Sequence, residues 1–298
     1  MRIATWNIYW LGDRDQSEIT RSDSDYELIA RVIRQLAPDV LALQEIVDPL
    51  LLQHILNLAN GEGRDYVIKS GDANWFTSDR KPLDPTNDYQ KVFFCINNAT
   101  IEFVQGAAIR GGPSGRRPYA ARLRERSSGK EFVAVAAHLH AGWPSFLDSG
   151  DAAQRRDEVE ALTRWLDGMA TAENNVFPEP DTDDVVILGD FNAEMNDPNH
   201  SLAPLRMGNM ANWSWMKPAP DGNHWESALW GGDRYVIDFI LFSESLAQKM
   251  TTQPKIYAWD HNPAMGGSET FHVGPNGSGN LKGYGVSDHR PVIAEVVL

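Results

Sequence analysis

Short runs of aliphatic and aromatic residues recur along this chain, and they constrain its fold more than any other feature. The run "VVIL" (185–188) has no alternating polar residue, which is typical of a strand covered on both faces. Because such runs alternate with helical patterns and no linker separates them, we expect two β-sheets packed face to face with helices outside. The other strand-like segments are 2–8, 39–46, 65–69, 91–96, 100–106, 119–126, 131–139, 235–243 and 289–298.

Three segments show the apolar periodicity of helices. Residues 24–38 form an amphipathic pattern in which Ser24 is the expected N-cap, Glu27 follows three residues later and Pro38 marks the end. Further helices are expected over 49–59 and 151–169. Together with the strands they predict an α/β protein with a single domain over 1–298.

Charge and cysteine content limit the class of protein. The formal net charge of −14 disfavours a protein that merely coats nucleic acid, but not an enzyme that meets phosphates through a bound cation. No apolar run approaches the roughly 20 residues that span a bilayer. If Met1 is native, no secretion signal precedes the first strand, and the compartment is left open. Cys95, the one cysteine, lies in "KVFFCI" and is expected in the core.

Polar side chains stand at or near one end of several predicted strands. A turn or a local ion pair would explain any one of them alone. In α/β sheets, however, ligands bind outside strand ends, so their common location predicts convergence at one edge. These residues are Asn7, Glu45, His138, Asp190, Asn192, Asp238, Asp288 and His289.

The chemistry of this set favours a hard metal ion. In an extended continuation of the 185–188 strand, Asp190 and Asn192 would point to the same side. Carboxylate and amide oxygens are the ligands that Mg²⁺ or Mn²⁺ prefers, whereas zinc would want Cys or several His, and "HLH" (138–140) is the only close-set pair. Asp238 and His289 could form a carboxylate–imidazole pair, which would fix the ring tautomer.

The motifs "TWNI", "LQEI", "AAHL", "GDFN", "IDFILFS" and "SDHRPV", in this order, resemble those of the endonuclease/exonuclease/phosphatase superfamily over nearly the whole chain. Segments 1–60 and 116–143 are most similar to its deoxyribonuclease I branch. The resemblance implies a four-layer α/β sandwich, two packed mixed β-sheets flanked by helices, and metal-dependent hydrolysis of phosphate esters.

The resemblance also implies which residues would hold the metal. By matching position, Asn7 and Glu45 would bind it, with Glu45 the principal ligand, and Asp288 would support the same metal or a second one. The implied cofactor is Mg²⁺, with Mn²⁺ as a substitute and a structural Ca²⁺ as a further option.

The remaining motif residues would act on the substrate. Asp238 would orient His289, which acts as a base or as a phosphate-contacting imidazole. Asp190 would orient or deprotonate the attacking water, and Asn192 would hold the phosphoryl oxygen. His138 would bind the phosphate or protonate the leaving oxygen. Which residue is the general base is left open.

Departures from the motifs of individual branches of the superfamily narrow the range of expected substrates. The Lys after "QE" and the Tyr-x-Pro-Asn element of the AP-endonuclease branch are missing, which argues against abasic-site repair. The inositol-phosphatase branch reads "GDLN" with a basic motif that is also absent. Where the deoxyribonuclease I branch has a DNA-holding Arg this chain has Val47, and Gln90 replaces a Glu that pairs with the first catalytic His.

A local basic segment offsets the acidic balance. Residues 110–130 contain six Arg and one Lys against a single acid. Arg116 precedes Pro118 as a DNA-contacting Arg does in the deoxyribonuclease I branch, and we expect Arg116 and Arg117 to bind substrate phosphates. Three further arginines, at 122, 124 and 126, share one strand face and either contact phosphate or protect an edge strand with charge.

Two segments fit no strand or helix pattern. Residues 212–233 hold four of the ten tryptophans, for which core packing is the first expectation and base stacking or a membrane interface are the alternatives. Residues 260–286 are Gly-rich and carry His261 and His272, which we expect to be solvated.

These observations predict a divalent-metal-dependent phosphodiester hydrolase, a deoxyribonuclease I-like endonuclease acting on DNA. The alternative is a phosphatase or sphingomyelinase-like phosphodiesterase of the same fold, acting on a lipid headgroup or small phosphate ester. A further alternative is a non-catalytic binding protein on this fold. The sequence points to no partner protein.

Overall fold

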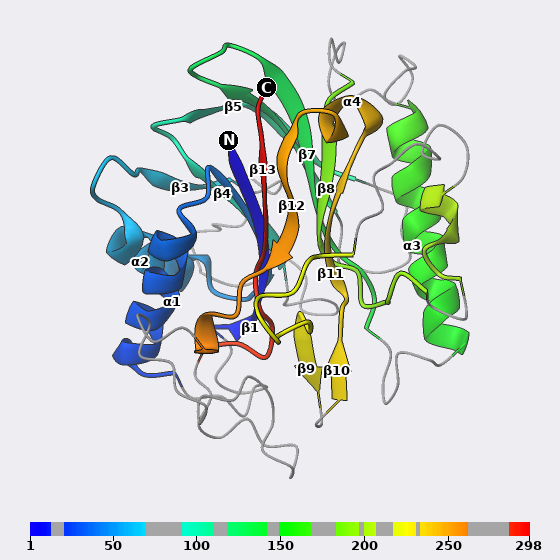
Figure 1. Cartoon of the computed structure of the whole chain (residues 1–298), viewed down its shortest axis with the longest axis horizontal. Helices are drawn as coiled ribbons and strands as arrows, with labels where there is room; N and C mark the ends of the chain where they lie inside the picture. The colour runs from blue at the N-terminus through cyan, green and yellow to red at the C-terminus, as the bar shows by residue number, and fades with distance from the viewer. Residues whose placement is uncertain are drawn as a thin grey trace, which may run out of the picture.

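The computed structural model has four layers; in Figure 1 the helices α1 (Asp23–Leu36) and α2 (Pro49–Ala59) lie at the left, α3 (Ser149–Gly168) lies at the right and the two sheets lie between them. Helices α1 and α2 cover one mixed sheet, and α3 covers a second sheet packed against the first. The expected four-layer α/β sandwich is therefore confirmed. The structure describes residues 1–12, 21–69, 91–109, 118–141, 149–168, 183–196, 200–206, 217–230, 233–261 and 286–298.

The first sheet has the strand order β12-β13-β1-β2-β4-β3. Strands β1 and β2 are parallel, and the other neighbouring pairs are antiparallel. The bounds are β1 Arg2–Leu11, β2 Val40–Ile46, β3 Tyr66–Lys69, β4 Lys91–Asn97, β12 Met250–Ile256 and β13 Val292–Val296.

The second sheet has the order β11-β8-β7-β6-β5, with β7 and β8 parallel and the other pairs antiparallel. Its bounds are β5 Ile101–Ala108, β6 Tyr119–Glu125, β7 Glu131–His138, β8 Val185–Asp190 and β11 Asp238–Phe242. A separate ribbon pairs β9 (Ala228–Trp230) with β10 (Asp233–Tyr235), and the short helices are η1 (Ala203–Arg206), α4 (Glu244–Ala247) and η3 (Trp259–His261).

Three apolar layers hold the sandwich together. Side chains alternate along each strand, so Ile3 and Val40 pack between the sheets while their neighbours Ala4 and Leu41 face the α1/α2 helices. A third layer packs the second sheet against α3. Cys95 is fully buried in the α1/α2 layer, as expected of a core residue.

The topology brings the polar strand ends to one edge. Because β1 and β2 are parallel, Asn7 lies in register with Gln44, beside Glu45. In the second sheet His138 of β7 pairs in register with Asp190 of β8. Strand β11 runs antiparallel to β8, so it begins at this same edge. Since β1 also contacts β8 and β11 across the interface between the sheets, both sets of strand ends meet.

The start of α1 differs from the expectation. The helix begins at Asp23 with Ser22 as N-cap, and the Ser22 backbone N–H donates to Asp25 Oδ2 at 2.7 Å. The prediction of Ser24 with Glu27 was wrong. The pair Ser22 and Asp25 has the same three-residue spacing, and the sequence alone does not choose between the two pairs. The end before Pro38 is confirmed, since Ala37 adopts the left-handed conformation after Leu36.

The segment 235–243 is not the single strand that its apolar run suggested. Strand β10 ends at Tyr235 and β11 begins at Asp238. Between them the chain leaves the ladder, and the N–H groups of Ile237 and Asp238 both donate to Ser227 Oγ at 3.1 Å. Strand β12 was missed because it is an edge strand with exposed polar residues and a proline, which weakens the apolar signal.

Candidate active site

The amide of Asn7 links the two sheets at the shared edge. Its Nδ2 donates to Glu45 Oε1 at 2.9 Å and to Asp190 Oδ2 at 3.0 Å. Its Oδ1 accepts the backbone N–H of Tyr9 at 2.9 Å and keeps a second lone pair. Glu45 is further held by the backbone N–H of Trp10, which donates to Oε2 at 3.1 Å. The two carboxylates are thus fixed on either side of one amide.

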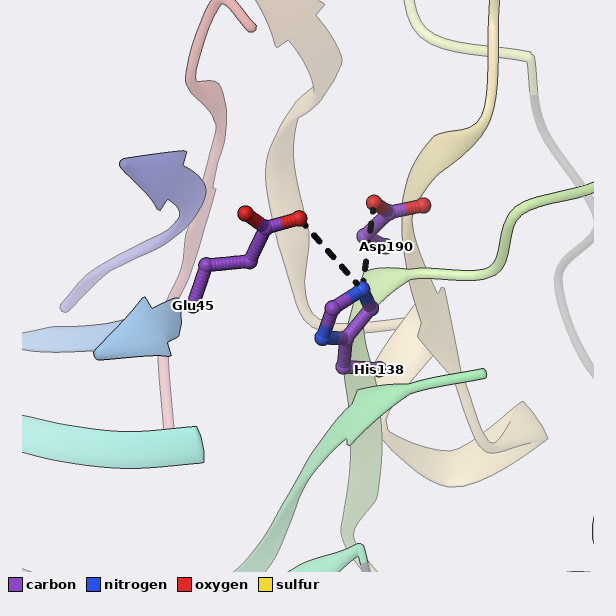
Figure 2. Close-up of side chains that lie close together, drawn as sticks. All are labelled: Glu45, His138 and Asp190. Atoms are coloured by element: carbon purple, nitrogen blue, oxygen red, sulfur yellow. Dashed lines mark ion pairs between the residues drawn. The ribbon is translucent and has the colours of Figure 1, made fainter. Parts of the chain in front are cut away.

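His138 faces the same two carboxylates. Its Nε2 lies 3.8 Å from Glu45 Oε1 and 3.8 Å from Asp190 Oδ2, as Figure 2 shows. One ligand atom from each of the three residues lies within 4.8 Å of the others, and all three side chains are buried. This spacing is compatible with a single ion held between them.

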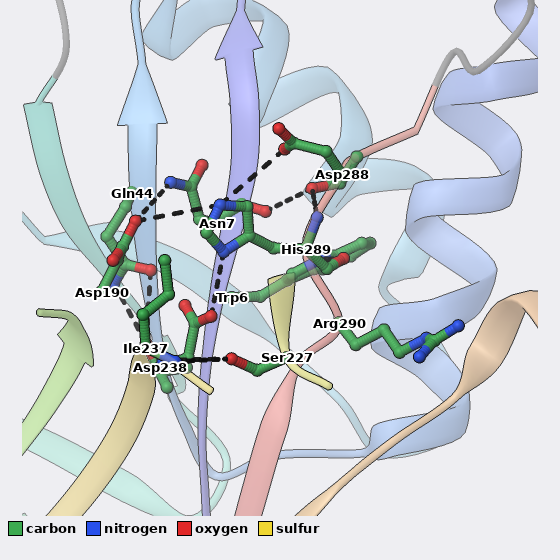
Figure 3. Close-up of polar contacts among 12 residues, drawn as sticks. Trp6, Asn7, Gln44, Asp190, Ser227, Ile237, Asp238, Asp288, His289 and Arg290 are labelled. Carbon is green, nitrogen blue, oxygen red and sulfur yellow. Dashed lines mark hydrogen bonds and ion pairs between the residues drawn. The ribbon is translucent and has the colours of Figure 1, made fainter. Parts of the chain in front are cut away.

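A second group is built around His289. Its Nδ1 lies 2.9 Å from Asp238 Oδ2, which is the carboxylate–imidazole pair predicted from the sequence. The other ring nitrogen, Nε2, is 3.9 Å from both Asp190 Oδ2 and Asp288 Oδ1 (Figure 3). The His289 carbonyl accepts the indole N–H of Trp6 at 3.0 Å, which fixes the backbone of the pair.

Burial of so many carboxylates changes their proton affinity. Burial raises the pKa of Asp190 to about 7, and the neighbouring Asp238 carboxylate acts in the same direction. Burial likewise raises the pKa of Asp288 to about 7. Burial alone would lower the pKa of His289, but the carboxylates of Asp238 and Asp288 outweigh it and raise the pKa well above the ordinary 6.5. The ring is therefore protonated near neutral pH.

The donor set fits a hard divalent cation. It consists mainly of carboxylate oxygens, with one imidazole and one amide oxygen, which suits Mg²⁺ or Mn²⁺ better than zinc. Asp238 Oδ1 and Asp288 Oδ1 are buried and accept no hydrogen bond from the described residues, so both oxygens are left without a donor. The "HLH" pair does not converge, because His140 Nε2 turns to Asp151 Oδ1 at 2.8 Å.

The "GDFN" segment bends rather than extends. Strand β8 ends at Asp190, and Asn192 has a φ of 47°, so the expectation that both side chains continue one strand face was wrong. The Asn192 backbone N–H donates to Asp190 Oδ1 at 2.8 Å, and its Nδ2 donates to the Leu139 carbonyl at 2.9 Å. Gly189 is required by close packing, since a Cβ there would lie 1.9 Å from the Ala137 carbonyl oxygen.

A buried frame of polar side chains behind this site was not predicted from the sequence. The Arg290 guanidinium binds the carboxylates of Asp260 at 2.6 Å and Glu226 at 2.7 Å. Ser287 Oγ donates to the Asn7 carbonyl at 2.6 Å, which ties the segment before β13 to the end of β1. Ser227 Oγ accepts the Asp238 N–H, so it fixes the start of β11. The sequence signal that could have revealed this frame is Arg290, the arginine directly after "SDH".

The basic segment divides into two parts. Residues 110–117, with Arg116 and Arg117, lie outside the described residues, as do Gln90 and His272. Arg122 and Arg124 form ion pairs with Glu131, and Arg126 donates to the Asn98 carbonyl at 2.9 Å. Strand β6 lies between β5 and β7, so the expectation that these arginines protect an edge strand was wrong. Their side chains are bound within the protein instead.

The core expectation for the Trp-rich segment is wrong at Trp225. This side chain is 41% exposed, and Lys217 Nζ lies 5.3 Å from its ring centroid. The reason is that its neighbour Glu226 takes the buried position and pairs with Arg290. Trp213 and Trp215 lie outside the described residues, as does 262–285 of the Gly-rich segment.

The fold is a four-layer α/β sandwich with a buried cluster of carboxylates and histidines at one edge of its two sheets. A family model described as Endonuclease/Exonuclease/phosphatase family matches residues 4–289. The chain therefore belongs to the endonuclease/exonuclease/phosphatase family, as the motifs suggested.

Individual relatives are distant. Nocturnin from Drosophila melanogaster is 27% identical over 207 residues, which is 66% of this chain but only 29% of the relative's length. Staphylococcus aureus beta toxin has a TM-score of 0.63 at 13% identity, with full coverage of both chains. A mannosyl-6-phosphatase from Bacteroides thetaiotaomicron has a TM-score of 0.61 at 14% identity, again with full coverage of both. A D. rerio TDP2 solved with a single-strand DNA product has a TM-score of 0.59 at 15% identity, and the match covers 99% of this chain and 97% of that one. These likenesses show the fold.

Among the described residues, none of the helices is both long enough and apolar enough to cross a membrane.

The raised pKa of Asp288 predicts how metal-free stability depends on pH. Its folded-state pKa of about 7 exceeds the ordinary 3.8, so folding stability is lost as pH rises between these values. In EDTA, Asp288→Asn removes this loss, and the variant should become more stable relative to the native protein from pH 5 to pH 8, by on the order of 2 kcal/mol. Thermal unfolding measures the difference.

Glu62→Gln, at an exposed turn, is the matched control for removing one negative charge, and its stability difference should not grow with pH. A variant Asp288→Asn that is less stable than the native protein at pH 8 in EDTA would contradict the burial argument.

Proposed function

We propose that this chain is a divalent-metal-dependent phosphodiesterase that cleaves nucleic acid, with DNA as its substrate. The observation that carries the proposal is the convergence of Glu45, His138, Asp190 and Asp288 with the Asp238–His289 pair at one edge of the two sheets. A non-catalytic binding protein would not need this buried set. We also propose that 1–298 is one catalytic domain, since residues from both ends of the chain share the apolar layer between the sheets.

The metal ligands in this proposal are Glu45, Asp288 and the amide oxygen of Asn7. Glu45 is the principal ligand, because its two oxygens are held from behind by the N–H donors of Asn7 and Trp10. Mg²⁺ is the proposed ion, with Mn²⁺ as a substitute. When bound, it supplies positive charge to the phosphoryl oxygens in a site that is otherwise acidic.

The proton-transfer roles follow from the pKa shifts. Asp190, with a pKa of about 7, is placed near the operating pH of a general base, and we assign to it the proton of the attacking water. His289 stays protonated because Asp238 holds its Nδ1, so its Nε2 is suited to contact a phosphate oxygen. Asn192 and His138 complete the proposed phosphate contacts.

The preference for nucleic acid rests on Arg116 and Arg117. Their segment joins the described fold at Ile109 and Pro118, where the Ile109 N–H donates to the Pro118 carbonyl at 2.8 Å. Pro118 precedes Tyr119, which pairs with Ala136 two residues before His138. Both ends of the segment 110–117 therefore join the described fold at the edge of the sheet that carries the site.

One observation favours the second candidate, a phosphatase or sphingomyelinase-like phosphodiesterase. The arginines of β6 that the structure describes are bound to Glu131 and Glu102, so they are not available to neutralise a long polyanion. A substrate with one phosphate would need no such extended basic surface.

Metal dependence is the first expected result. EDTA should abolish hydrolysis, and Mg²⁺ or Mn²⁺ should restore it. Glu45→Gln removes one charge with little change in shape, so the Mg²⁺ concentration for half-maximal activity should rise at least about tenfold without loss of folding. Glu62→Gln should leave it unchanged. Near-normal activity of Glu45→Gln at sub-millimolar Mg²⁺ would show that Glu45 is not the principal ligand.

The Asp238–His289 pair should act as a unit. Each of Asp238→Asn and His289→Ala should lower kcat by roughly 10²–10⁴-fold, and the double variant should lose little more than the worse single variant. The reason is that Asp238 acts through the ring it holds. Multiplicative losses in the double variant would mean that the two residues work separately.

DNA as substrate predicts a steep salt dependence. Plasmid nicking should weaken between about 50 and 200 mM salt, by roughly 0.9 log units per log unit of salt for each phosphate neutralised on a duplex. The double substitution Arg116→Ala/Arg117→Ala should flatten this slope by about one to two units.

Arg126→Ala is the matched control, because Arg126 is exposed at the opposite end of β6, beyond Glu125. It should leave the salt slope unchanged. Absence of nicking at low salt, together with metal-dependent hydrolysis of sphingomyelin or a small phosphate ester, would replace the nuclease proposal with the second candidate.

A further inference from the structure

The end of β1 contains a strained tip that holds the site from behind. Tyr9 and Trp10 have φ values of 46° and 47°, a region that side chains with a Cβ rarely adopt. The backbone N–H of Tyr9 donates to Asn7 Oδ1, and that of Trp10 donates to Glu45 Oε2. Such a conformation is strained, and it persists only where surrounding contacts impose it.

Arg21 supplies contacts that impose this conformation. Its Nη2 donates to the carbonyls of Ile8 and Tyr9, both at 2.6 Å, and its Nη1 lies 3.3 Å from the Trp10 carbonyl. Three consecutive carbonyls of the tip therefore converge on one guanidinium. A planar fork of N–H donors can bind several carbonyls at once, which a lysine ammonium on a flexible stem does less well.

The same guanidinium reaches the other segment of the site. Its Nη2 also lies 3.0 Å from the carbonyl of Val286, two residues before Asp288. Ser287, between them, donates to the Asn7 carbonyl. Arg21 thus connects the tip after Asn7 with the segment that carries Asp288, although it precedes that segment by 265 residues in the sequence.

We propose that Arg21 is a positioning residue that sets the metal site before the ion binds, by fixing the 8–10 tip and the 286–288 segment in one arrangement. This inference rests on the proposed metal-dependent function. Without Arg21 the Tyr9 and Trp10 N–H groups would no longer be aimed at Asn7 and Glu45, and the ligands would have to be ordered when the ion arrives.

The charge of Arg21 and its hydrogen bonds have opposite expected effects on the affinity of the site for metal. Burial lowers its pKa to about 10, so it remains a cation at neutral pH, and its charge is felt by Asp288 and Glu45. A fixed cation repels an incoming metal ion, so charge alone predicts tighter metal binding in a neutral variant. If positioning dominates, Arg21→Ala and Arg21→Lys should both bind metal more weakly, the lysine variant less severely because it keeps part of the carbonyl contacts.

The test is direct Mn²⁺ binding by calorimetry to the full chain, with no substrate present. Positions that orient metal ligands typically change affinity by about 10–100-fold, so the Mn²⁺ dissociation constant should rise at least about tenfold in Arg21→Ala and by a smaller factor in Arg21→Lys. The matched control is Arg34→Ala, which also removes an arginine bound to a backbone carbonyl, that of Leu58 at 3.0 Å, but an exposed one that contacts helix α2. It should bind Mn²⁺ as the native protein does.

Steady-state kinetics separates positioning from general damage. At saturating Mn²⁺, Arg21→Ala should recover most of the native kcat, because bound metal restores the ligand arrangement. If Arg21→Ala does not fold, the Arg21→Lys affinity decides. Native-like or tighter Mn²⁺ binding by the folded variants would overturn this inference alone, whereas a native protein that binds no Mn²⁺ would overturn the proposed function as well.

Discussion

The burial of several carboxylates at the meeting edge of two sheets is the constraint on which the rest of the site depends. Asp190, Asp238 and Asp288 are each at most 2% exposed, and bringing negative charges this close out of water is strongly unfavourable without compensation. The protein compensates in part with the protonated ring of His289 and the amide of Asn7. The unfavourable free energy that is not compensated raises the pKa values of Asp190 and Asp288. A cation bound among these carboxylates would offset it.

The sandwich supplies the rigidity that such a site needs. The parallel pairs β1/β2 and β7/β8 fix two pairs of strand ends, and the apolar layer between the sheets holds these pairs against each other. Buried polar side chains then fix the connecting segments. Arg290 is held between Glu226 and Asp260, and the hydroxyls of Ser227 and Ser287 fix the starts of the segments bearing Asp238 and His289. Glu45 and Asn192 both adopt positive φ at this edge, so backbone strain is concentrated at the site.

The charge distribution bears on the substrate question. A chain with a net charge of −14 has to supply positive charge locally wherever it meets a phosphate. The described arginines of β6 do not do so, because they are bound to Glu131 and Glu102. The proposed sources of that charge are the metal ion, the His289 ring and the Arg116/Arg117 segment, and the relative weight of these three separates a nuclease from an enzyme that acts on a single phosphate.

The sequence by itself determined the layers, because apolar periodicity is local, and it predicted the polar residues that meet at the shared edge, because the motifs stand at strand ends. It located α2 at 49–59 and placed Glu45, His138, Asp190, Asp238 and His289 in one constellation. It did not determine the choice between Ser22 and Ser24 as N-cap, the bend at Asn192, or the break between β10 and β11, since each depends on what packs against that segment. Only the tertiary structure brought Arg21 to Val286 and Arg290 to Glu226 and Asp260. No local pattern encodes such contacts, because their partners lie far away in the chain and meet only when the sheets pack.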